Sequence, residues 1–300
     1  RGDRFTVAAA GHPRVTPASG PYHGRRDPRR ARNPDGGGSA DYPPAVTMTS
    51  HLLLGRDHET YGAHHVVDVS PRTAAAISVG ADREFAREME KRHANEDAVL
   101  VLEDERHTVL CVADAHFGRE ASEHLLMVLE RELQPVPENA ARLAAVLDAM
   151  ARVRSRARYD SETTLAVCIL DRMFRQAFGV SFGDSSIFRA APGQVPVRLN
   201  ERTNAFVSLA VPRSVRARGA RPFAATLADG ELLVAFTDGV DECCYREPDR
   251  SITPFVLRGL LDAAGHAPAA AARAVMRAAL EGVGGQPGGQ DNVALAVTRA

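Results

Sequence analysis

Lysine is almost absent from this sequence. Of its 300 residues only Lys91 is a lysine, whereas lysine and arginine together number 37. We attribute the excess of arginine to genome base composition and assign Lys91 no function. The formal net charge of -1 argues against a protein that binds nucleic acid over its whole surface.

Cysteine is also scarce, and long apolar runs are missing. Four cysteines do not make a disulfide framework at this length. Because Cys111 and Cys168 lie in apolar, strand-like runs and Cys243 and Cys244 are adjacent, we expect reduced, buried thiols. No apolar run approaches the roughly 18 residues that a membrane span needs. No secretory signal is visible, although the sequence opens at arginine and not at methionine, and we expect a cytoplasmic protein by default.

Residues 1–62 differ in composition from the rest of the chain. They are dense in glycine, proline and arginine, with the run R-R-D-P-R-R-A-R at 25–32. Few apolar residues are spaced to form a face, so burial cannot offset the entropy cost of ordering this segment. We predict a disordered tail, followed by one domain at 63–300. Contact of the arginine run with an acidic partner or nucleic acid is the less economical interpretation.

Hydrophobic periodicity in residues 63–300 predicts both strands and helices. Proline at the first position of each of the last two helices is typical of a helix start. Hairpin-linked strand groups with helix pairs between them indicate a four-layer α+β domain, without the alternation of a parallel sheet. We expect strands at 74–79, 98–102, 108–113, 164–170, 176–182, 186–189, 197–199, 231–237 and 292–298, and helices at 119–133, 138–158, 254–264 and 268–281.

A polar loop between two apolar runs marks the first candidate site. The runs, 98–102 and 108–113, are rich in valine and leucine and predict a β-hairpin. Antiparallel pairing then places Asp97 opposite Asp114, with Cβ atoms about 4.5–5.5 Å apart. Two carboxylates this close repel each other. Either a divalent metal lies beside them, or the pair is a solvated strand end.

Three further aspartates share this position at the end of an apolar strand. Asp184 follows V-S-F-G, Asp238 follows L-L-V-A-F-T, and Asp291 precedes N-V-A-L-A-V. Each alone fits an ordinary turn. Together with Asp97 and Asp114 they form a set of hard oxygen ligands that suits Mg²⁺ or Mn²⁺, and no cysteine–histidine spacing favours zinc.

Six motifs occur in order over about residues 70–300. They are R-H-A-N-E-D-A, V-A-D-A-H-F-G, T-T-L-A-V, F-G-D-S-S, F-T-D-G-V and G-Q-D-N-V. Together they resemble the motifs of the metal-dependent (type 2C) serine/threonine protein phosphatases. The resemblance implies a four-layer α/β/β/α sandwich of two antiparallel sheets flanked by helix pairs. It also implies hydrolysis of phosphoserine and phosphothreonine in proteins by a water that Mg²⁺ or Mn²⁺ activates.

The same resemblance assigns residues to the metals and to the substrate. Arg92 would bind the phosphate, because a guanidinium fork matches two phosphate oxygens. His116 would protonate the leaving oxygen, unless it is a histidine that simply packs after a strand. The resemblance implies two ions, bridged by the carboxylate of Asp114 and also bound by the backbone carbonyl of Ala115, Asp238 and Asp291. Glu96 and Asp97 would hold the ions through waters. Asp184 would join Asp238 at a looser third metal position.

Three departures from the family pattern leave a second function open. Ala115 and Phe117 replace glycines, and Glu162 stands where glycine is usual. A positive φ at Ala115 would cost about 1–2 kcal/mol. The alternative is a phosphatase-fold protein that recognises phosphorylated partners with little or no turnover. The short 201–230 segment resembles that of compact bacterial phosphatases, which implies a monomer that acts on a signalling or stress regulator.

Overall fold

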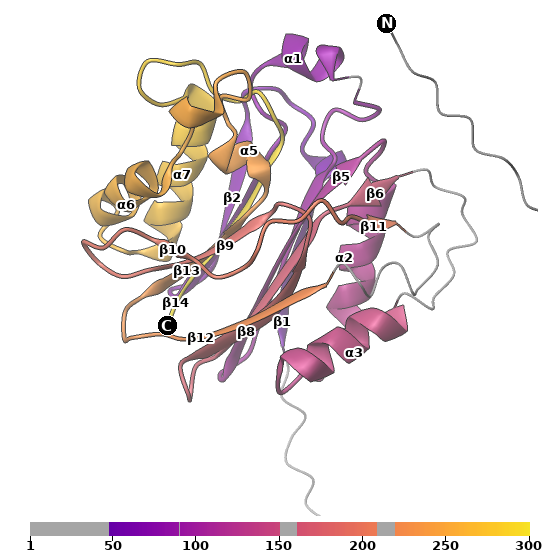
Figure 1. The fold of residues 1–300 in the computed structure, drawn as a ribbon, viewed down its shortest axis with the longest axis vertical. Helices are drawn as coiled ribbons and strands as arrows, with labels where there is room; N and C mark the ends of the chain where they lie inside the picture. Colours follow the sequence, from indigo (N-terminus) through magenta and orange to yellow (C-terminus); the bar gives the residue numbers. More distant parts are fainter. Residues whose placement is uncertain (1–47, 90, 151–160, 209–219) are drawn as a thin grey trace, which may run out of the picture. The chain divides into compact units, whose positions relative to one another are not determined.

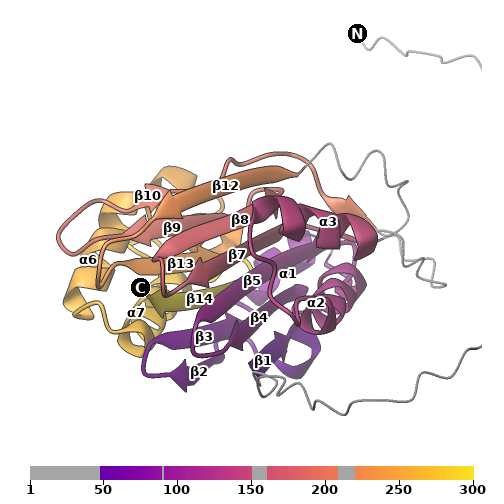
Figure 2. The ribbon, with the colours of Figure 1, turned by 90° about the horizontal axis from the view of Figure 1, so that it is seen from below.

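The computed structural model describes residues 48–89, 91–150, 161–208 and 220–300, all of them within the compact unit Val46–Ala300. These residues form two antiparallel sheets with helices on the outer face of each (Figures 1 and 2). The predicted α+β sandwich is therefore confirmed. Across the described ranges, no helix is both long and apolar enough to cross a membrane.

The first sheet runs in the order β1–β4–β5–β7–β8–β12, and the short strands β6 and β11 extend it beside the end of β5. Its strands are β1 (Thr49–Leu54), β4 (Asp97–Glu103), β5 (His107–His116), β6 (Glu162–Thr163), β7 (Leu165–Asp171), β8 (Gln176–Phe182), β11 (Val207–Ser208) and β12 (Arg221–Thr226). The second sheet runs in the order β10–β9–β13–β14–β3–β2. Its strands are β2 (His64–Ser70), β3 (Thr73–Ser78), β9 (Ser186–Ala190), β10 (Val197–Arg198), β13 (Leu232–Phe236) and β14 (Val293–Arg299).

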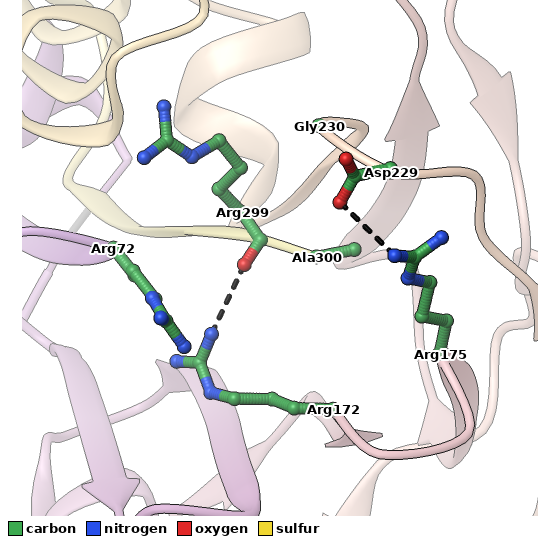
Figure 3. A pocket seen from close by; sticks show the side chains of 7 residues that line it. All are labelled: Arg72, Arg172, Arg175, Asp229, Gly230, Arg299 and Ala300. Atoms are coloured by element: carbon green, nitrogen blue, oxygen red, sulfur yellow. Dashed lines mark hydrogen bonds and ion pairs between the residues drawn. The ribbon is translucent and has the colours of Figure 1, made fainter.

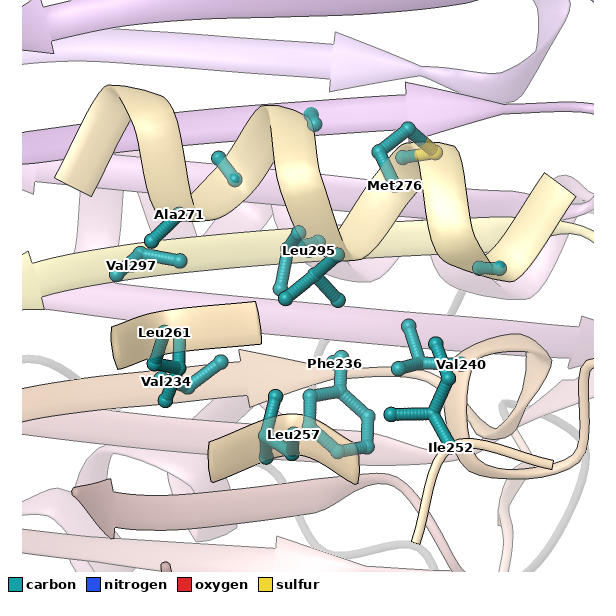
Figure 4. Packing of buried hydrophobic residues seen from close by; sticks show 14 of the residues in the cluster. Val234, Phe236, Val240, Ile252, Leu257, Leu261, Ala271, Met276, Leu295 and Val297 are labelled. Atoms are coloured by element: carbon teal, nitrogen blue, oxygen red, sulfur yellow. The ribbon is translucent and has the colours of Figure 1, made fainter. Parts of the chain in front are cut away.

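A pair of helices covers each sheet. α2 (Glu120–Glu132) and α3 (Ala140–Met150) pack on the first sheet, and α6 (Pro254–Ala263) and α7 (Pro268–Glu281) pack on the second. Figure 4 shows the apolar layer under α6 and α7, where Leu257 and Met276 meet Phe236 and Leu295 of the sheet. The shorter elements are α1 (Arg83–Glu88), α5 (Asp238–Asp241) and the 3₁₀ turns Gly55–Asp57 and Pro248–Arg250.

The central strands are buried on both faces. In β4, Leu100 and Leu102 belong to the core shared with α2 and α3, whereas Val99 and Val101 belong to the core between the two sheets. Successive side chains of a strand point to opposite faces, so a strand with two buried faces is a continuous apolar run. This double burial explains why the sequence shows unbroken apolar runs instead of alternation.

Part of the predicted disordered tail belongs to the folded domain. Thr49–Leu54 forms β1, which pairs antiparallel with β4, and its Leu53 and Leu54 are buried. The boundary predicted at residue 62 is therefore wrong, because the strand that buries this short L-L-L run lies much later in the chain. Residues 1–47 of the predicted tail lie outside the described residues.

Candidate functional site

Four of the predicted aspartates meet at one edge of the two sheets. Asp97 lies opposite Asp114 in the β4–β5 pair, as the hairpin predicts. In the second sheet Asp238 follows β13 and Asp291 precedes β14, and these two strands are neighbours. Each of the four carboxyl groups interacts electrostatically with the other three. The strand-end aspartates thus converge although they come from both sheets.

Thr237 connects the two sheets beside these acids. Its hydroxyl donates to Asp97 Oδ2 at 2.7 Å and accepts the backbone N–H of Ala294 at 2.9 Å. Thr237 directly follows β13, Ala294 lies in β14, and Asp97 begins β4. One buried hydroxyl therefore fixes the carboxylate of the first sheet against the strand ends of the second.

Burial opposes ionisation of these acids. Removal from water raises the pKa of Asp97 to about 7, and Asp291 and Asp238 add to that rise, while Lys91 and the Thr237 hydroxyl oppose it. Burial likewise raises the pKa of Asp114 and of Asp238 well above the ordinary carboxyl value, and neighbouring carboxylates raise both further. A cation at this edge would favour the ionised forms.

Several carboxylate oxygens at this edge lack a partner. Asp97 Oδ1, Asp184 Oδ1 and Asp238 Oδ1 are buried and accept no hydrogen bond. Unpartnered hard oxygens of this kind fit Mg²⁺ or Mn²⁺. Among the described residues, however, no three histidine, cysteine, aspartate or glutamate side chains are already arranged to hold one ion. The donor chemistry fits a divalent metal, and its binding would require the carboxylates to rearrange.

The T-T pair at 163–164 fixes the backbone of Asp114. The Asp114 N–H donates to Thr164 Oγ1 at 3.0 Å, and the Asp114 carbonyl accepts both the Thr163 hydroxyl at 2.9 Å and the Thr164 N–H at 2.8 Å. Gly183 has φ +81° and lies against Thr164, where a Cβ would clash with the threonine side chain. The motifs T-T-L-A-V and F-G-D-S-S therefore hold the backbone of the motif V-A-D-A-H-F-G in place.

Asn292 organises the loop that precedes β4. Its Oδ1 accepts the Glu96 N–H at 2.9 Å, and its Nδ2 donates to the carbonyls of Val79 at 3.0 Å and Ala94 at 2.9 Å. The carbonyl of Asn292 lies so close to Gly239 that a Cβ on that glycine would overlap it. The glycine after Asp238 is thus required by this close approach, in addition to any turn.

Lys91 is the site residue that sequence reasoning missed. Its ammonium forms an ion pair with Asp291 and donates to Asn292 Oδ1 at 2.9 Å. Burial alone would lower the pKa of Lys91, but the carboxylates of Asp291, Asp114 and Asp97 outweigh it and raise that pKa above its ordinary value. A charged ammonium therefore lies among the acids. The only feature of the sequence that pointed to Lys91 was that it is the only lysine of the chain.

The residues around His116 lie at the rim of this site. His116 Nε2 is 3.8 Å from Asp114 Oδ2, and its ring meets that of Phe206 edge-on with centroids 4.8 Å apart. Ala115 is not among the residues with positive φ, so the strain considered for it does not arise. The positive φ falls instead on Phe117, at 62°, whose side chain is exposed. Glu162 pairs with His116 across β5 and β6.

Two further predicted residues, Arg92 and Glu96, lie just before β4. Arg92 is exposed in the loop before β4. The Glu96 carboxylate is buried and accepts the backbone N–H of His93 at 3.1 Å. Burial raises the pKa of Glu96, and the backbone donors and Lys91 oppose that rise. Both residues thus lie on the segment that Asn292 holds in place.

Asp184 lies near a second group of charged side chains, Asp241, Arg198 and Arg202, which the sequence did not indicate. Asp241, one turn after Asp238, is half-buried and accepts from Ser186 Oγ at 3.1 Å and from Arg198 at 2.8 Å. Burial raises its pKa, and Arg202 and Arg198 oppose the rise. Asp184 interacts electrostatically with Asp238 and with both arginines. The predicted looser metal position therefore adjoins a site where arginine already balances carboxylate.

Two cavities of the described surface contain none of the four aspartates. Figure 3 shows a cavity of about 450 Å³ lined by Arg72, Arg172, Arg175, Asp229, Gly230, Arg299 and Ala300. It lies at the far end of β14, since that strand runs from beside Asp291 to Arg299. A second cavity of about 400 Å³ includes Asp241, Arg198 and Arg202. Neither contains a residue that the sequence assigned to catalysis or metal binding.

Solved structures of phosphatases share this fold. Over 79% of this chain and 64% of the other, it superimposes on the PP2C phosphatase domain of the cell fate determinant SpoIIE from Bacillus subtilis (TM-score 0.52, 16% identity). RsbX in complex with magnesium gives 0.52 and 11% identity over 79% and 99% of the chains. The Mycobacterium tuberculosis serine/threonine phosphatase PstP/Ppp gives 0.53 and 19% identity over 76% and 97%.

Sequence comparison gives a family and no individual relative. None of the curated proteins matches this chain. The family model described as stage II sporulation protein E (SpoIIE) matches residues 104–300. That match includes Asp114, Asp184, Asp238 and Asp291 and begins after Asp97. Since it spans well over half of the sequence, the chain belongs to the stage II sporulation protein E (SpoIIE) family, and its fold is that of the type 2C phosphatases.

Proposed function

We propose that this protein is a Mg²⁺- or Mn²⁺-dependent phosphatase that hydrolyses phosphoserine and phosphothreonine in protein substrates. The observation that carries the proposal is the convergence of Asp97, Asp114, Asp238 and Asp291 at one edge, with buried oxygens that lack partners. Similar folds support the choice of metal, since RsbX was solved with magnesium and PstP with two manganese ions. The substrate class that we propose is a phosphorylated signalling regulator, since one phosphatase domain of this fold belongs to the cell fate determinant SpoIIE.

The carboxylates of Asp97, Asp114, Asp238 and Asp291 would hold the ions. Bound divalent ions supply a water that ionises near neutral pH and neutralise charge on the phosphoryl oxygens. Thr237 and the T-T pair at 163–164 keep Asp97 and Asp114 in place, so less reorganisation is needed.

Arg92 and His116 would serve the substrate. Arg92, on the loop held by Asn292, would bind the phosphate with its planar fork. His116, beside Asp114, would carry the proton to the seryl or threonyl oxygen as it leaves. Its contact with Phe206 limits the positions of the imidazole ring.

A specific observation favours the second candidate, a phosphatase-fold protein that binds phosphorylated partners without turnover. The described acids are not arranged as a ligand set, and the exposed Phe117 projects from the rim beside His116.

Turnover distinguishes the two functions. We expect release of nitrophenol from p-nitrophenyl phosphate, and of phosphate from a phosphoserine peptide, with Mn²⁺ and none in EDTA. Binding of the peptide without release of phosphate would favour the alternative.

The stabilisation by Mn²⁺ should depend on pH. A carboxyl pKa raised by folding means that the folded state favours the protonated acid. The metal-free protein therefore loses stability from about pH 4, the ordinary carboxyl value, up to about pH 7, the folded value for Asp97. Mn²⁺ replaces that proton. We expect a small rise in Tm with Mn²⁺ at pH 5 and a rise of several degrees at pH 8, and a pH-independent rise would contradict the assignment of these acids as ligands.

A further inference from the structure

The only lysine of the chain lies inside the group of acids. The Lys91 side chain is 12% exposed, as is that of its ion-pair partner Asp291. Its ammonium also donates to Asn292 Oδ1 at 2.9 Å and attracts the carboxylates of Asp114 and Asp97. Surface lysines of globular proteins point to solvent, whereas a buried lysine needs partners of this kind.

Hydrogen bonds with neighbouring residues fix the position of Lys91. Its N–H donates to the Ala86 carbonyl at 3.4 Å, which places it directly after α1. Asn292, which receives the ammonium, is itself fixed by the Glu96 N–H and by the carbonyls of Val79 and Ala94. A lysine on an unconstrained loop would have no hydrogen-bond acceptor held in place in this way.

The ammonium distinguishes Asp291 from Asp97 and Asp238. Asp97 and Asp238 each keep a buried oxygen without a partner, whereas Asp291 already has a cation. A divalent ion that reaches Asp291 must displace the ammonium or share the carboxylate with a like charge. Repulsion between cations a few ångströms apart in a buried site costs several kcal/mol at an effective dielectric constant of about 20.

We propose that Lys91 is a tethered cation that competes with a divalent ion for Asp291, so that the metal centre binds an ion there only when Lys91 is displaced. The inference rests on the proposed function, since it concerns the same centre. Its consequence is a weaker ion at Asp291 than at the carboxylates that Lys91 leaves open. The protein would then respond to the available Mn²⁺ concentration through this one side chain.

Isothermal titration of the full chain with Mn²⁺ tests this competition. Lys91→Met keeps the length of the side chain and removes its charge, so the weakest Mn²⁺ step should tighten at least tenfold. Lys91→Arg keeps the charge and should leave that step within about threefold of the unaltered protein. Arg87→Met is the matched control, because Arg87 is exposed on α1 and loses the same unit of charge.

A thermal scan gives a readout that does not depend on turnover. In EDTA, Lys91→Met should melt below the unaltered protein, because Asp291 and Asn292 lose their buried partner. In saturating Mn²⁺ it should recover and gain more than the unaltered protein. Lys91→Gln serves as a second variant if Lys91→Met does not fold.

The outcomes separate this inference from the proposed function. Equal Mn²⁺ affinities of Lys91→Met and the unaltered protein, or equal tightening by Arg87→Met, would overturn the competition. Loss of Mn²⁺ binding in Lys91→Met would overturn it too, since Lys91 would then organise the centre. Absence of Mn²⁺ binding in every protein, the unaltered one included, would instead remove the metal-dependent function itself.

Discussion

Asp238→Asn is expected to abolish turnover and to weaken Mn²⁺ binding strongly. The substitution keeps the size of the side chain and removes a negative charge from a buried position. Loss of a residue that only supports a ligand typically costs 10–100-fold in metal affinity. Loss of a ligand should therefore cost at least about 100-fold, and turnover should fall by about 1,000-fold or more, as for other electrostatic groups of active sites.

Arg92→Ala should separate phosphate binding from metal binding. Arg92 is exposed in the loop before β4, and we propose that its guanidinium binds the phosphate and not the metal ions. Mn²⁺ affinity should therefore stay within about twofold, while KM for a phosphoserine peptide rises. If the guanidinium contacts tighten in the transition state, kcat falls as well. Calorimetry with Mn²⁺ and steady-state kinetics on the same preparations measure both effects.

Asp229→Asn is the matched control for the loss of charge. Asp229 lies in the arginine-lined cavity, its side chain is 81% exposed, and it pairs with Arg175. The same substitution there should change neither Mn²⁺ affinity nor turnover. Equal loss of metal in Arg92→Ala and Asp238→Asn would show that Arg92 organises the centre. Unchanged turnover in both would show that the active site lies elsewhere.

The parts of the fold that the sequence predicts are those set by local pattern. β8 and α7 have the predicted bounds, Gln176–Phe182 and Pro268–Glu281. β8 follows a tight turn from β7, and α7 begins at a proline and ends before Gly282, whose φ is 85°. The Asp97–Asp114 register follows likewise from the centre of one hairpin loop. In each case the determining residues are neighbours in the chain.

The parts that the sequence does not predict depend on contacts between distant segments. β1 is short, and it is buried by contacts with distant segments: it pairs with β4, and its Leu53 and Leu54 join the two cores on either side of the sheet. β2 lies at the edge of its sheet, where His64, His65 and Asp68 are exposed, so no apolar pattern marks it. α1 has only six residues and begins at the side-chain cap of Asp82. Local periodicity carries too little signal for such elements.

The same reason explains which site residues were missed. Strand-end aspartates are visible because each adjoins an apolar run. Lys91 sits in a charged stretch that is indistinguishable from a solvated helix until Asp291, two hundred residues later, is placed beside it. Asp241 is hidden in the same way, because Arg198 and Ser186 reach it from another strand pair. A side chain whose partners are far along the chain leaves no local pattern.

Asn292→Ala should be among the most destabilising single substitutions outside the apolar core. Asn292 is 2% exposed, and its amide joins the start of β14 to Lys91, Glu96, Val79 and Ala94. Truncation leaves several of these buried groups without a partner, at about 1–3 kcal/mol each. Allowing for partial relaxation, we expect the free energy of unfolding to fall by about 4 kcal/mol in urea titrations.

Asn292→Asp and Asn204→Ala test that reason. Asn292→Asp keeps an acceptor for Lys91 and the Glu96 N–H but loses both donors, so its destabilisation should be smaller than that of Asn292→Ala. Asn204 is exposed, and its replacement by alanine should change the free energy of unfolding by less than about 0.5 kcal/mol. If Asn292→Ala were equally mild, the loop from Lys91 to Glu96 would not depend on this amide. The ammonium among the acids would then have to be held by Asp291 alone.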